Sequence, residues 1–354
     1  MKRIAIIPGD GIGPEVASEA MRVLKRLQVR GLPVEWQVFP YGAEYYLREN
    51  RAMPEGGMQE LAAFDAVYVA AFGDDRVPDM AHAREILLGA RRSLDLYVNE
   101  RPVRLLDDAF TPLKGRSCRD VNFVILRENT EGAYVGMGGR FKVGTPEEMA
   151  LQEVVATRKG VQRILRHAFE RARSAPRRRL HMADKHNALE FVGGLWYGTF
   201  LEMAKDYPEV EASHLYIDRL CHDLVRDPSA FEVIVTSNLL GDMISDLGAA
   251  LAGGLGIAPS ANLNPETGKG LFEPVHGAAP DIAGLGAANP MAAVLSAAMM
   301  LDFLGFAEAA EQVREAVRGC ASAGKVTRDL GGILSTREAG QAICEALPAA
   351  QGGH

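Results

Sequence analysis

The chain has 354 residues, of which 47% are hydrophobic and 24% are charged, and its formal net charge is −7. This balance is typical of a soluble globular protein that is long enough for one large domain or two closely joined ones. The negative net charge, without a long segment dominated by Lys and Arg, argues against a nucleic-acid partner. The densest basic run, at residues 177–179, follows a proline and is interpreted as a solvated turn.

The N-terminal residues and the cysteines bear on the cellular compartment. Residues 1–4 lead directly into a short apolar run, so the sequence predicts neither a signal peptide nor a membrane-spanning stretch of about 20 apolar residues. The four cysteines are scattered without CxxC spacing, which argues against a disulfide framework or a zinc site. We therefore expect reduced cysteines, a cytoplasmic location and no membrane contact.

Short β-rich runs alternate with helical patterns along the chain. Residues 3–7 predict a strand that is followed by a helix over 13–27, and further strands are expected at 66–70, 122–126, 180–183 and 231–236. A helix is expected from residue 240, and two long helices over 291–304 and 307–321 follow. This alternation is typical of an α/β fold with a largely parallel sheet.

The first predicted strand ends in the glycine-rich turn PGDGIGPE at residues 8–15. Glycine permits a tight turn, and Pro14 suits the first position of a helix. The glycine spacing is not G-x-G-x-x-G, however, so the turn does not predict a Rossmann dinucleotide-binding fold. A plain strand-to-helix turn is the stronger interpretation.

Asp242 and Asp246 lie four residues apart in the helical stretch that follows the strand at 231–236. This spacing puts both carboxylates on one helix face near the carboxyl end of a strand. Two close carboxylates repel each other unless a cation lies between them, and oxygen ligands favour Mg²⁺ or Mn²⁺ over Zn²⁺. A solvated helix face is the alternative, and Asp218 is a weaker candidate ligand.

Three arginines are candidate anion-binding residues. Arg91 lies in a helical stretch, Arg101 precedes a proline, and Arg127 follows the apolar strand at 122–126. Guanidinium groups bind carboxylates in a bidentate manner, although each arginine alone is more typical of a surface charge.

Lys185 and Tyr134 are candidates for proton transfer. Lys185 directly follows the strand at 180–183, and Tyr134 follows a glycine-containing turn. A buried lysine with a lowered pKa can act as a base, and a tyrosine can relay a proton. The alternatives are an ordinary exposed lysine and an aromatic residue of the core.

Six motifs occur together and in order: GDGIGPEV at 9–16, NERP at 99–102, RENTEG at 127–132, DKHN at 184–187, NLLGDMISD at 238–246 and FEPVHG at 272–277. This set resembles the isocitrate and 3-isopropylmalate dehydrogenase family, and the resemblance covers essentially the whole chain. It implies an isopropylmalate dehydrogenase-like two-domain α/β fold with a mixed, largely parallel sheet, distinct from the Rossmann fold. The implied large domain comprises residues 1–98 and 252–354, and the small central domain, residues 99–251, carries the contact of a homodimer.

The resemblance also implies roles at matching positions. Arg91, Arg101 and Arg127 would hold the carboxylates of the substrate. Three aspartates would bind Mg²⁺ or Mn²⁺: Asp242 and Asp246, with Asp218 of the partner subunit. Tyr134 and Lys185, the lysine reaching from the partner subunit, look like the acid–base pair, so that the active sites are shared.

The adenosine of the cofactor would lie against a loop near the C-terminal part of the chain. The resemblance assigns five residues to it: Glu273, His276, Gly277, Asp281 and Asn289. The carboxylate of Asp281 would accept hydrogen bonds from a ribose diol and repel a 2′-phosphate, so NAD is expected rather than NADP.

The implied reaction oxidises a malate-type 2-hydroxy acid and then releases its β-carboxylate as carbon dioxide. The divalent ion would stabilise the negative charge that develops on the substrate oxygen. Lys185 would take the hydroxyl proton and Tyr134 would protonate the enol carbon. The arginines would align the β-carboxylate for cleavage.

The helical stretch before Arg91 is implied to select the substrate. Leu87 and Leu88 match the leucines that surround an isopropyl group, and the serine of isocitrate enzymes is absent. The favoured interpretation is therefore conversion of 3-isopropylmalate to 2-oxoisocaproate, as in leucine biosynthesis. Tartrate and D-malate enzymes, which are similar at 138–148, remain alternatives, as do homoisocitrate enzymes and an alkylmalate enzyme of a secondary pathway. A catalytically silent nucleotide-binding subunit is disfavoured, because the aspartates, arginines, tyrosine and lysine are all present.

Three departures from the family pattern stand out: Glu100 in the NERP motif, His186 after the lysine, and GDDR at residues 73–76. His186 would contact the substrate, shift the pKa of Lys185, or point away from it.

Overall fold

The computed structural model describes residues 1–348. The chain forms two compact units: unit 1 comprises Met1–Leu96, Arg104–Cys118 and the chain from Ala249 on, and unit 2 comprises Tyr97–Val103 and Arg119–Gly248. Residues 104–118, which the sequence assigns to the central domain, group with unit 1, where Phe110 lies against Gly253.

Unit 1 contains five neighbouring strands in the order β2-β1-β3-β12-β11. Strands β1, β2, β3 and β12 run parallel to one another, whereas β11 is antiparallel to β12. The sheet is therefore mixed and largely parallel, and the predicted strands at 3–7 and 66–70 are confirmed. The strands are β1 (Lys2–Gly9), β2 (Val34–Val38), β3 (Ala66–Ala71), β11 (Pro259–Asn264) and β12 (Lys269–Pro274).

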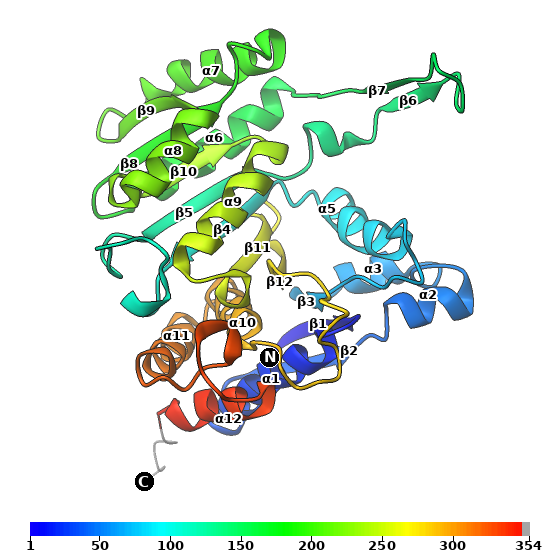
Figure 1. Ribbon diagram of the computed structural model, residues 1–354, viewed down its shortest axis with the longest axis vertical. Coiled ribbons are helices and arrows are strands. Elements are labelled where there is room, and N and C mark those ends of the chain that lie inside the picture. Colours follow the sequence, from blue (N-terminus) through cyan, green and yellow to red (C-terminus); the bar gives the residue numbers. More distant parts are fainter. Residues whose placement is uncertain (349–354) are drawn as a thin grey trace. The chain divides into compact units, whose positions relative to one another are not determined.

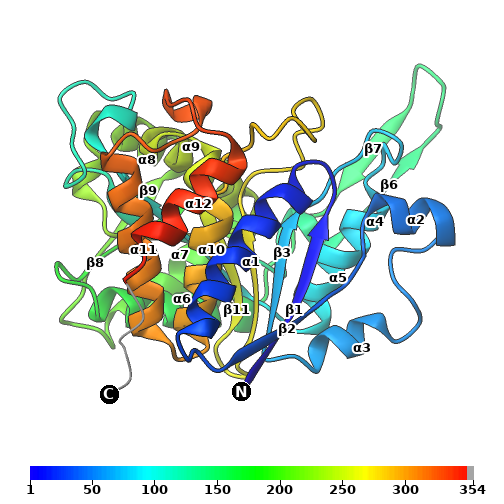
Figure 2. The ribbon, with the colours of Figure 1, turned by 90° about the horizontal axis from the view of Figure 1, so that it is seen from below.

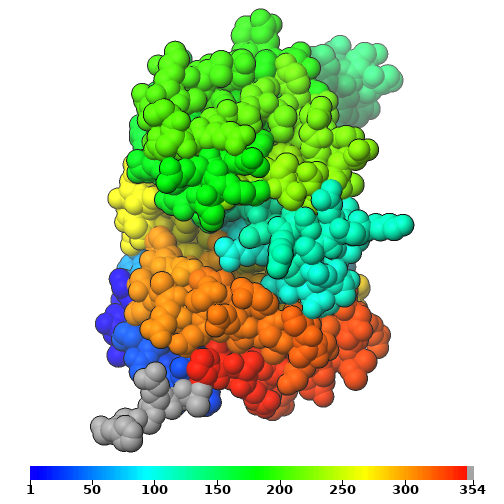
Figure 3. All heavy atoms as spheres, turned by 90° about the vertical axis from the view of Figure 1, so that its left-hand side faces the viewer, coloured from blue at the N-terminus to red at the C-terminus, as the bar shows by residue number. Residues whose placement is uncertain are grey.

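The helices of unit 1 include the predicted helix at 13–27 and the two predicted near the C-terminus. Helix α10 is buried around most of its circumference, because its alanines allow close packing on β11, β12 and α1 (Figure 2). Helices α11 and α12 lie side by side on the surface (Figure 3). The helices are α1 (Gly13–Val29), α2 (Ala43–Glu49), α3 (Gly57–Ala62), α4 (Ala81–Ala83), η1 (Arg84–Leu88), α5 (Gly89–Ser93), η2 (Asp108–Phe110), η5 (Leu255–Ile257), α10 (Met291–Phe303), α11 (Ala307–Ser322), η6 (Arg328–Leu330) and α12 (Thr336–Ala346).

Unit 2 contains five strands in the order β4-β5-β10-β8-β9. Strands β5, β10, β8 and β9 are parallel. The side chains of β10 are all buried, as expected for a central strand of a parallel sheet that is covered on both faces. The strands are β4 (Val98–Arg104), β5 (Asn122–Glu128), β8 (Arg179–Asp184), β9 (Glu211–Tyr216) and β10 (Val233–Thr236).

The helices of unit 2 cover its sheet, and a two-stranded arm extends from the unit (Figure 1). All eight strand residues of the arm, β6 (Gly138–Phe141) and β7 (Met149–Gln152), are exposed. In the described part of the chain, no helix is both long and apolar enough to cross a membrane. The helices are η3 (Ala133–Val135), α6 (Arg158–Arg173), α7 (Glu190–Ala204), α8 (Ile217–Arg226), η4 (Pro228–Ala230) and α9 (Asn238–Ala252), the last of which continues into unit 1.

Candidate active site

Arg127 is a buried arginine at the carboxyl end of β5, with a relative exposure of 1%. The neighbouring strand β10 ends at Thr236, which lies opposite Arg127, so the first turn of α9 begins beside the guanidinium. The Nε and Nη2 atoms of Arg127 donate to Oδ1 of Asn238 at 2.9 and 2.7 Å, and Nη1 donates to Asp242. These hydrogen bonds and this ion pair stabilise the buried guanidinium, because burying an unpaired charge is energetically costly.

Helix α9 presents a row of polar side chains on one face. Asn238, Asp242, Ser245 and Asp246 are spaced by four, three and one residues, which places them on the same side of an α-helix. The sequence singles out the two aspartates, whereas the supporting roles of Asn238 and Ser245 emerge only from the structure. Their helical spacing from Asp242 is the signal that identifies them.

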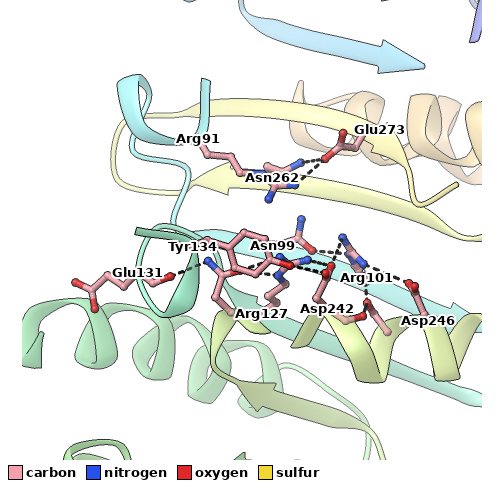
Figure 4. A network of polar contacts seen from close by, with 12 residues as sticks. Arg91, Asn99, Arg101, Arg127, Glu131, Tyr134, Asp242, Asp246, Asn262 and Glu273 are labelled. Carbon is pink, nitrogen blue, oxygen red and sulfur yellow. Dashed lines mark hydrogen bonds and ion pairs between the residues drawn. The ribbon is translucent and has the colours of Figure 1, made fainter. Parts of the chain in front are cut away.

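Arg101 on β4 reaches the same helix face (Figure 4). Its Nε donates to Oδ1 of Asn99 at 2.8 Å, and its Nη1 donates to Oγ of Ser245 at 2.6 Å. Its guanidinium nitrogens also lie 3.6 Å from Asp242 and 3.8 Å from Asp246. Unit 2 therefore directs two predicted substrate-binding arginines at one predicted metal ligand.

Tyr134 completes this group. It lies in the short helix η3, where its hydroxyl donates to Oδ2 of Asp242 at 2.7 Å and the Arg127 guanidinium lies over its ring. Burial, and the hydrogen bond to Asp242, raise the pKa of Tyr134 above its ordinary value. The hydroxyl therefore keeps its proton at neutral pH, as a general acid must.

The two carboxylates on α9 differ in their electrostatic environment. Burial acts to raise the pKa of Asp242, but Arg127, Tyr134 and Arg101 together hold it below its ordinary value. Burial raises the pKa of Asp246, and the nearby charge of Asp242 adds to this rise against the opposing effect of Arg101. A divalent cation would relieve this repulsion, and the donor set of hard oxygen atoms fits Mg²⁺ or Mn²⁺.

Lys185 and Asp218 form a separate pair in unit 2. The Lys185 ammonium donates to Oδ1 of Asp218 at 2.5 Å, where both side chains are partly exposed. Within the described residues of one chain, Asp218 does not join Asp242 and Asp246 in a cluster of potential metal ligands. The predicted set takes Asp218 from the partner subunit and stays a prediction.

Two of the three departures from the family pattern have structural explanations. Glu100 on β4 lies within 3.6 Å of Arg171 and 4.0 Å of His167, both on α6. Both side chains lower the pKa of Glu100 although burial opposes them, so the residue belongs to a polar network inside unit 2. In the 73–76 turn, Asp74 accepts hydrogen bonds from the backbone and side chain of Arg76, which lower its pKa to about 2.

The third departure, His186, turns its ring toward Asp184. Its Nδ1 lies 3.1 Å from Oδ1 of Asp184, and its ring stacks on Tyr197 with the centroids 4.5 Å apart. The three predicted alternatives for its effect at Lys185 stay predictions.

Of the predicted substrate residues of unit 1, Arg91 forms a buried ion pair. Nη2 of Arg91 donates to Oε1 of Glu273 at 3.2 Å, and Asn262 donates to the same oxygen at 2.9 Å (Figure 4). Leu87 packs against the core of unit 1, whereas Leu88 is half-buried at the end of the π-helical turn η1. Glu273 is thus positioned to orient Arg91, and its role as a cofactor contact stays a prediction.

The remaining predicted cofactor residues lie in the loop after β12 and before α10. Gly277 and Asp281 are exposed, whereas Asn289 is buried and donates to Asp329 at 3.0 Å. Nδ1 of His276 lies 3.0 Å from the carbonyl oxygen of Gly277, so this nitrogen must carry the proton. Among the described residues, Nε2 of His276 is a buried acceptor without a partner, and burial lowers the pKa of the ring. A donor such as an adenine amino group would satisfy it.

Comparisons with known proteins agree along the whole chain. The family model described as isocitrate/isopropylmalate dehydrogenase matches residues 3–343. The chain is 46% identical to D-malate dehydrogenase [decarboxylating] of Escherichia coli (strain K12), over 98% of both chains. It is 43% identical to 3-isopropylmalate dehydrogenase of Thermobifida fusca (strain YX), over 97% of both. The solved structure of isocitrate dehydrogenase from Methylococcus capsulatus matches with a TM-score of 0.90 at 36% identity, covering 98% of this chain and 99% of that one.

The fold, the site and these matches together define an enzyme of the oxidative, decarboxylating dehydrogenase class. The chain belongs to the isocitrate/isopropylmalate dehydrogenase family.

Gly241 provides the space in which Arg127 reaches Asp242. A Cβ atom at Gly241 would lie 2.7 Å from both Cβ and Cγ of Arg127, which are close to the backbone of β5 and have little freedom to move. We expect Gly241→Ala to lower the free energy of unfolding by about 1–3 kcal/mol, the usual cost of overpacking. Because Arg127 would be displaced, kcat/KM should fall as well.

The matched control is Gly319→Ala on α11, where an added Cβ meets no atom within 4 Å. This variant should be as stable as the wild type or gain up to about 1 kcal/mol from helix propensity. Urea unfolding of both variants measures the difference, and equal stability of the two would contradict the close approach at Gly241.

Proposed function

We propose that this chain is a cytoplasmic enzyme that uses NAD and Mg²⁺ or Mn²⁺ to oxidise and decarboxylate a malate-type 2-hydroxy acid. The observation that carries the proposal is the convergence of Arg101, Arg127 and Tyr134 on Asp242. One candidate metal ligand is thereby surrounded by two guanidinium groups that can bind carboxylates and by a hydroxyl that holds its proton.

Different residues of the chain bind the substrate and transfer its protons in the proposed reaction. Arg101 and Arg127, held by Asn99 and Asn238, bind the substrate carboxylates and align the bond that breaks. Lys185 would accept the proton of the substrate hydroxyl, and a bound nicotinamide would supply the hydride acceptor. A bound divalent ion supplies Lewis-acid stabilisation of negative charge on the substrate oxygens. After carbon dioxide departs, the Tyr134 hydroxyl donates its proton to the carbon that carried the β-carboxylate.

The loop after β12 supports the assignment of the cofactor. The buried Nε2 of His276, which has no partner among residues 1–348, is an acceptor that suits an adenine amino group. The exposed carboxylate of Asp281 can accept hydrogen bonds from ribose hydroxyls and would repel a 2′-phosphate, so NAD is preferred over NADP.

The surface of unit 2 supports a homodimer with shared active sites. Helix α7 is apolar, yet only five of its fifteen residues are buried, and Phe191 at its start is 87% exposed. Met243 on α9 is 66% exposed, and the arm exposes Phe141 and Met149. Exposed apolar side chains of this kind are favoured where a partner covers them. A second copy covering them would bring its own Lys185 and Asp218 to the neighbouring Asp242 and Asp246.

The substrate is proposed to be a 3-substituted malate, with 3-isopropylmalate as the first candidate. Leu88 offers a half-buried apolar side chain at the end of η1, one turn before Arg91. An alkyl substituent is stabilised by contact with such a surface, at about 25 cal/mol per Å² of apolar area removed from water. D-Malate and the related tartrate are the second candidates, because the D-malate enzyme of Escherichia coli is 46% identical over essentially the full length.

A substrate panel tests the proposal. The purified protein is assayed with 3-isopropylmalate, D-malate, tartrate, isocitrate and homoisocitrate, each with NAD and NADP, in Mg²⁺, in Mn²⁺ and in excess chelator. We expect NAD reduction and carbon dioxide release, highest kcat/KM with 3-isopropylmalate, and loss of activity in chelator that either metal ion restores. In an apolar pocket, one missing methylene of the substrate typically lowers kcat/KM by about 10–200-fold. A pocket that fits the isopropyl group would therefore give a large, measurable preference for 3-isopropylmalate over D-malate. If the protein turned over none of these 2-hydroxy acids, the proposed function would be refuted. A higher kcat/KM with D-malate than with 3-isopropylmalate would identify D-malate as the substrate.

A further inference from the structure

A cluster of histidine, tyrosine and carboxylate side chains lies beside Lys185, outside the group around Asp242. Strands β8 and β9 are parallel, with Met182 opposite His214 and Asp184 opposite Tyr216. Because side chains alternate along a strand, Asp184, His214 and Tyr216 project from the same face of these two strands. His186 follows two residues after Asp184 and extends the same row.

Two imidazole nitrogens converge on the carboxylate of Asp184. Nε2 of His214 lies 2.7 Å from Oδ1, and Nδ1 of His186 lies 3.1 Å from Oδ1 and 3.2 Å from Oδ2. Asp184 is buried, and within the described residues its hydrogen bonds and ion pairs involve these two imidazoles and no Lys or Arg. A carboxylate is costly to bury unless a positive charge lies beside it, and a metal cation held between this carboxylate and the two imidazoles would supply one.

The surroundings of the cluster have the features of a supported metal site. The Tyr216 hydroxyl lies 3.2 Å from Nε2 of His186, the nitrogen that points away from Asp184. Tyr197 on α7 stacks on the His186 ring at 4.5 Å, with an interplanar angle of 15°, and its centroid lies 4.8 Å from that of His214. Partners of the outer ring nitrogen fix the orientation of ligating histidines in metalloproteins.

We propose that Asp184, His186 and His214 bind a divalent transition metal of the zinc class, at a site separate from the Mg²⁺ or Mn²⁺ site on α9. Two imidazoles and one carboxylate select Zn²⁺, Co²⁺, Ni²⁺ or Cu²⁺ over Mg²⁺, which prefers oxygen ligands. Metal–ligand distances of about 2.0–2.2 Å require ligand atoms roughly 3.3 Å apart in a tetrahedral site. The two nitrogens already lie 2.7 and 3.1 Å from Oδ1 of Asp184, and all three ligand atoms lie within 4.8 Å of one another, so binding requires rearrangement of these side chains but not of the strands.

The hydrogen bonds of the cluster allow both imidazoles to bind a metal ion in their neutral forms. When the metal takes Nδ1 of His186, the proton of that ring resides on Nε2 and is donated to the hydroxyl oxygen of Tyr216. His214 binds through Nε2 and keeps its proton on Nδ1. Asp184 and His186 flank Lys185 in sequence, so an ion at this site fixes the backbone on both sides of the predicted base.

Cobalt(II) is the probe that tests the site. The full-length protein is stripped with chelator, supplied with a large excess of Mg²⁺ to occupy oxygen-ligand sites, and titrated with Co²⁺ while visible spectra are recorded. Four-coordinate Co²⁺ absorbs much more strongly than the six-coordinate ion that oxygen-rich sites hold. We expect an intense band that saturates at one Co²⁺ per chain and disappears when Zn²⁺ is added.

Variants assign the band to the cluster. His214→Gln keeps an amide donor for Asp184 but removes the imidazole, and should abolish the band, whereas Tyr216→Phe should weaken Co²⁺ binding by about 10–100-fold. Asp242→Asn and His222→Ala should leave the band unchanged, the latter because His222 is an exposed histidine elsewhere in unit 2 that pairs with Asp223. Thermal unfolding shows that each variant is folded.

Two results would overturn the proposal: a wild-type protein that gives only weak, six-coordinate absorption, or an unchanged band in folded His214→Gln. The cluster would then be a hydrogen-bond network without a metal. Because the readout is spectroscopic, it is independent of the reaction that the enzyme catalyses.

Discussion

Replacing Asp242 with Asn is expected to lower kcat/KM by at least about 10³-fold, since general acid catalysis alone contributes about 10²–10⁴-fold and metal binding adds to it. The carboxylate accepts the hydrogen bond of Tyr134 and pairs with Arg127, besides being a candidate metal ligand. The substitution therefore disturbs acid, substrate-binding and metal-binding groups together. Steady-state kinetics across a range of Mg²⁺ and Mn²⁺ concentrations measure the loss.

Asp246→Asn is the matched control for folding. Asp242 provides the counter-charge of buried Arg127, and breaking a buried ion pair costs about 3–5 kcal/mol. The side chain of Asp246 is 61% exposed and lies 3.8 Å from Arg101, so its loss should leave the melting temperature near that of the wild type. We expect Asp246→Asn to need far more metal for activity while remaining as stable as the wild type. Near-normal turnover by folded Asp242→Asn would contradict the proposed role of this face of α9.

The strands and helices with strong patterns were predictable from the sequence, and those with weak patterns were not. The apolar run in β5 and the alanine-rich α10 have the periodicity that their burial requires, and both predictions are confirmed. Strand β4 has the sequence VNERPVR, in which polar side chains and a proline mask the strand pattern. Its polar side chains, Asn99 and Arg101, are buried because they pair with each other and with α9.

Two groups of contacts that the sequence did not predict depend on strand pairing. His214 and Tyr216 lie on β9, and only its parallel register with β8 brings them to Asp184. The motif predicts a cofactor contact for Glu273, and the antiparallel pairing of β12 with β11 also places it beside Asn262 and Arg91, which the motif does not indicate. Contacts between residues that are distant in sequence cannot be read from local periodicity.

At a metal concentration too low for Asp246→Asn to be active, mixing two inactive variants is expected to restore about half of the wild-type activity per heterodimer, a consequence of the two-fold symmetry of the proposed shared-site dimer. The variants are Lys185→Ala and Asp246→Asn, both chosen at partly exposed positions so that each remains folded. Suppose that Lys185 serves the active site of the neighbouring subunit and Asp246 serves its own. One active site of the heterodimer then lacks both residues, and the other active site has both. Differently tagged chains, co-purified and assayed as verified heterodimers, provide the measurement.

The pairing of Lys185 with Asp218 supplies the control. Their side chains lie 2.5 Å apart in one chain, so in the proposed dimer both would serve the same site. In a heterodimer of Lys185→Ala with Asp218→Asn, one active site then lacks Lys185 and the other lacks Asp218. We expect this heterodimer to stay inactive. Rescue in this second heterodimer, or inactivity of the first while both chains are folded and dimeric, would show that the active sites are not shared in the proposed way. Because both heterodimers contain the same Lys185→Ala chain, the difference between them depends only on which site each aspartate serves.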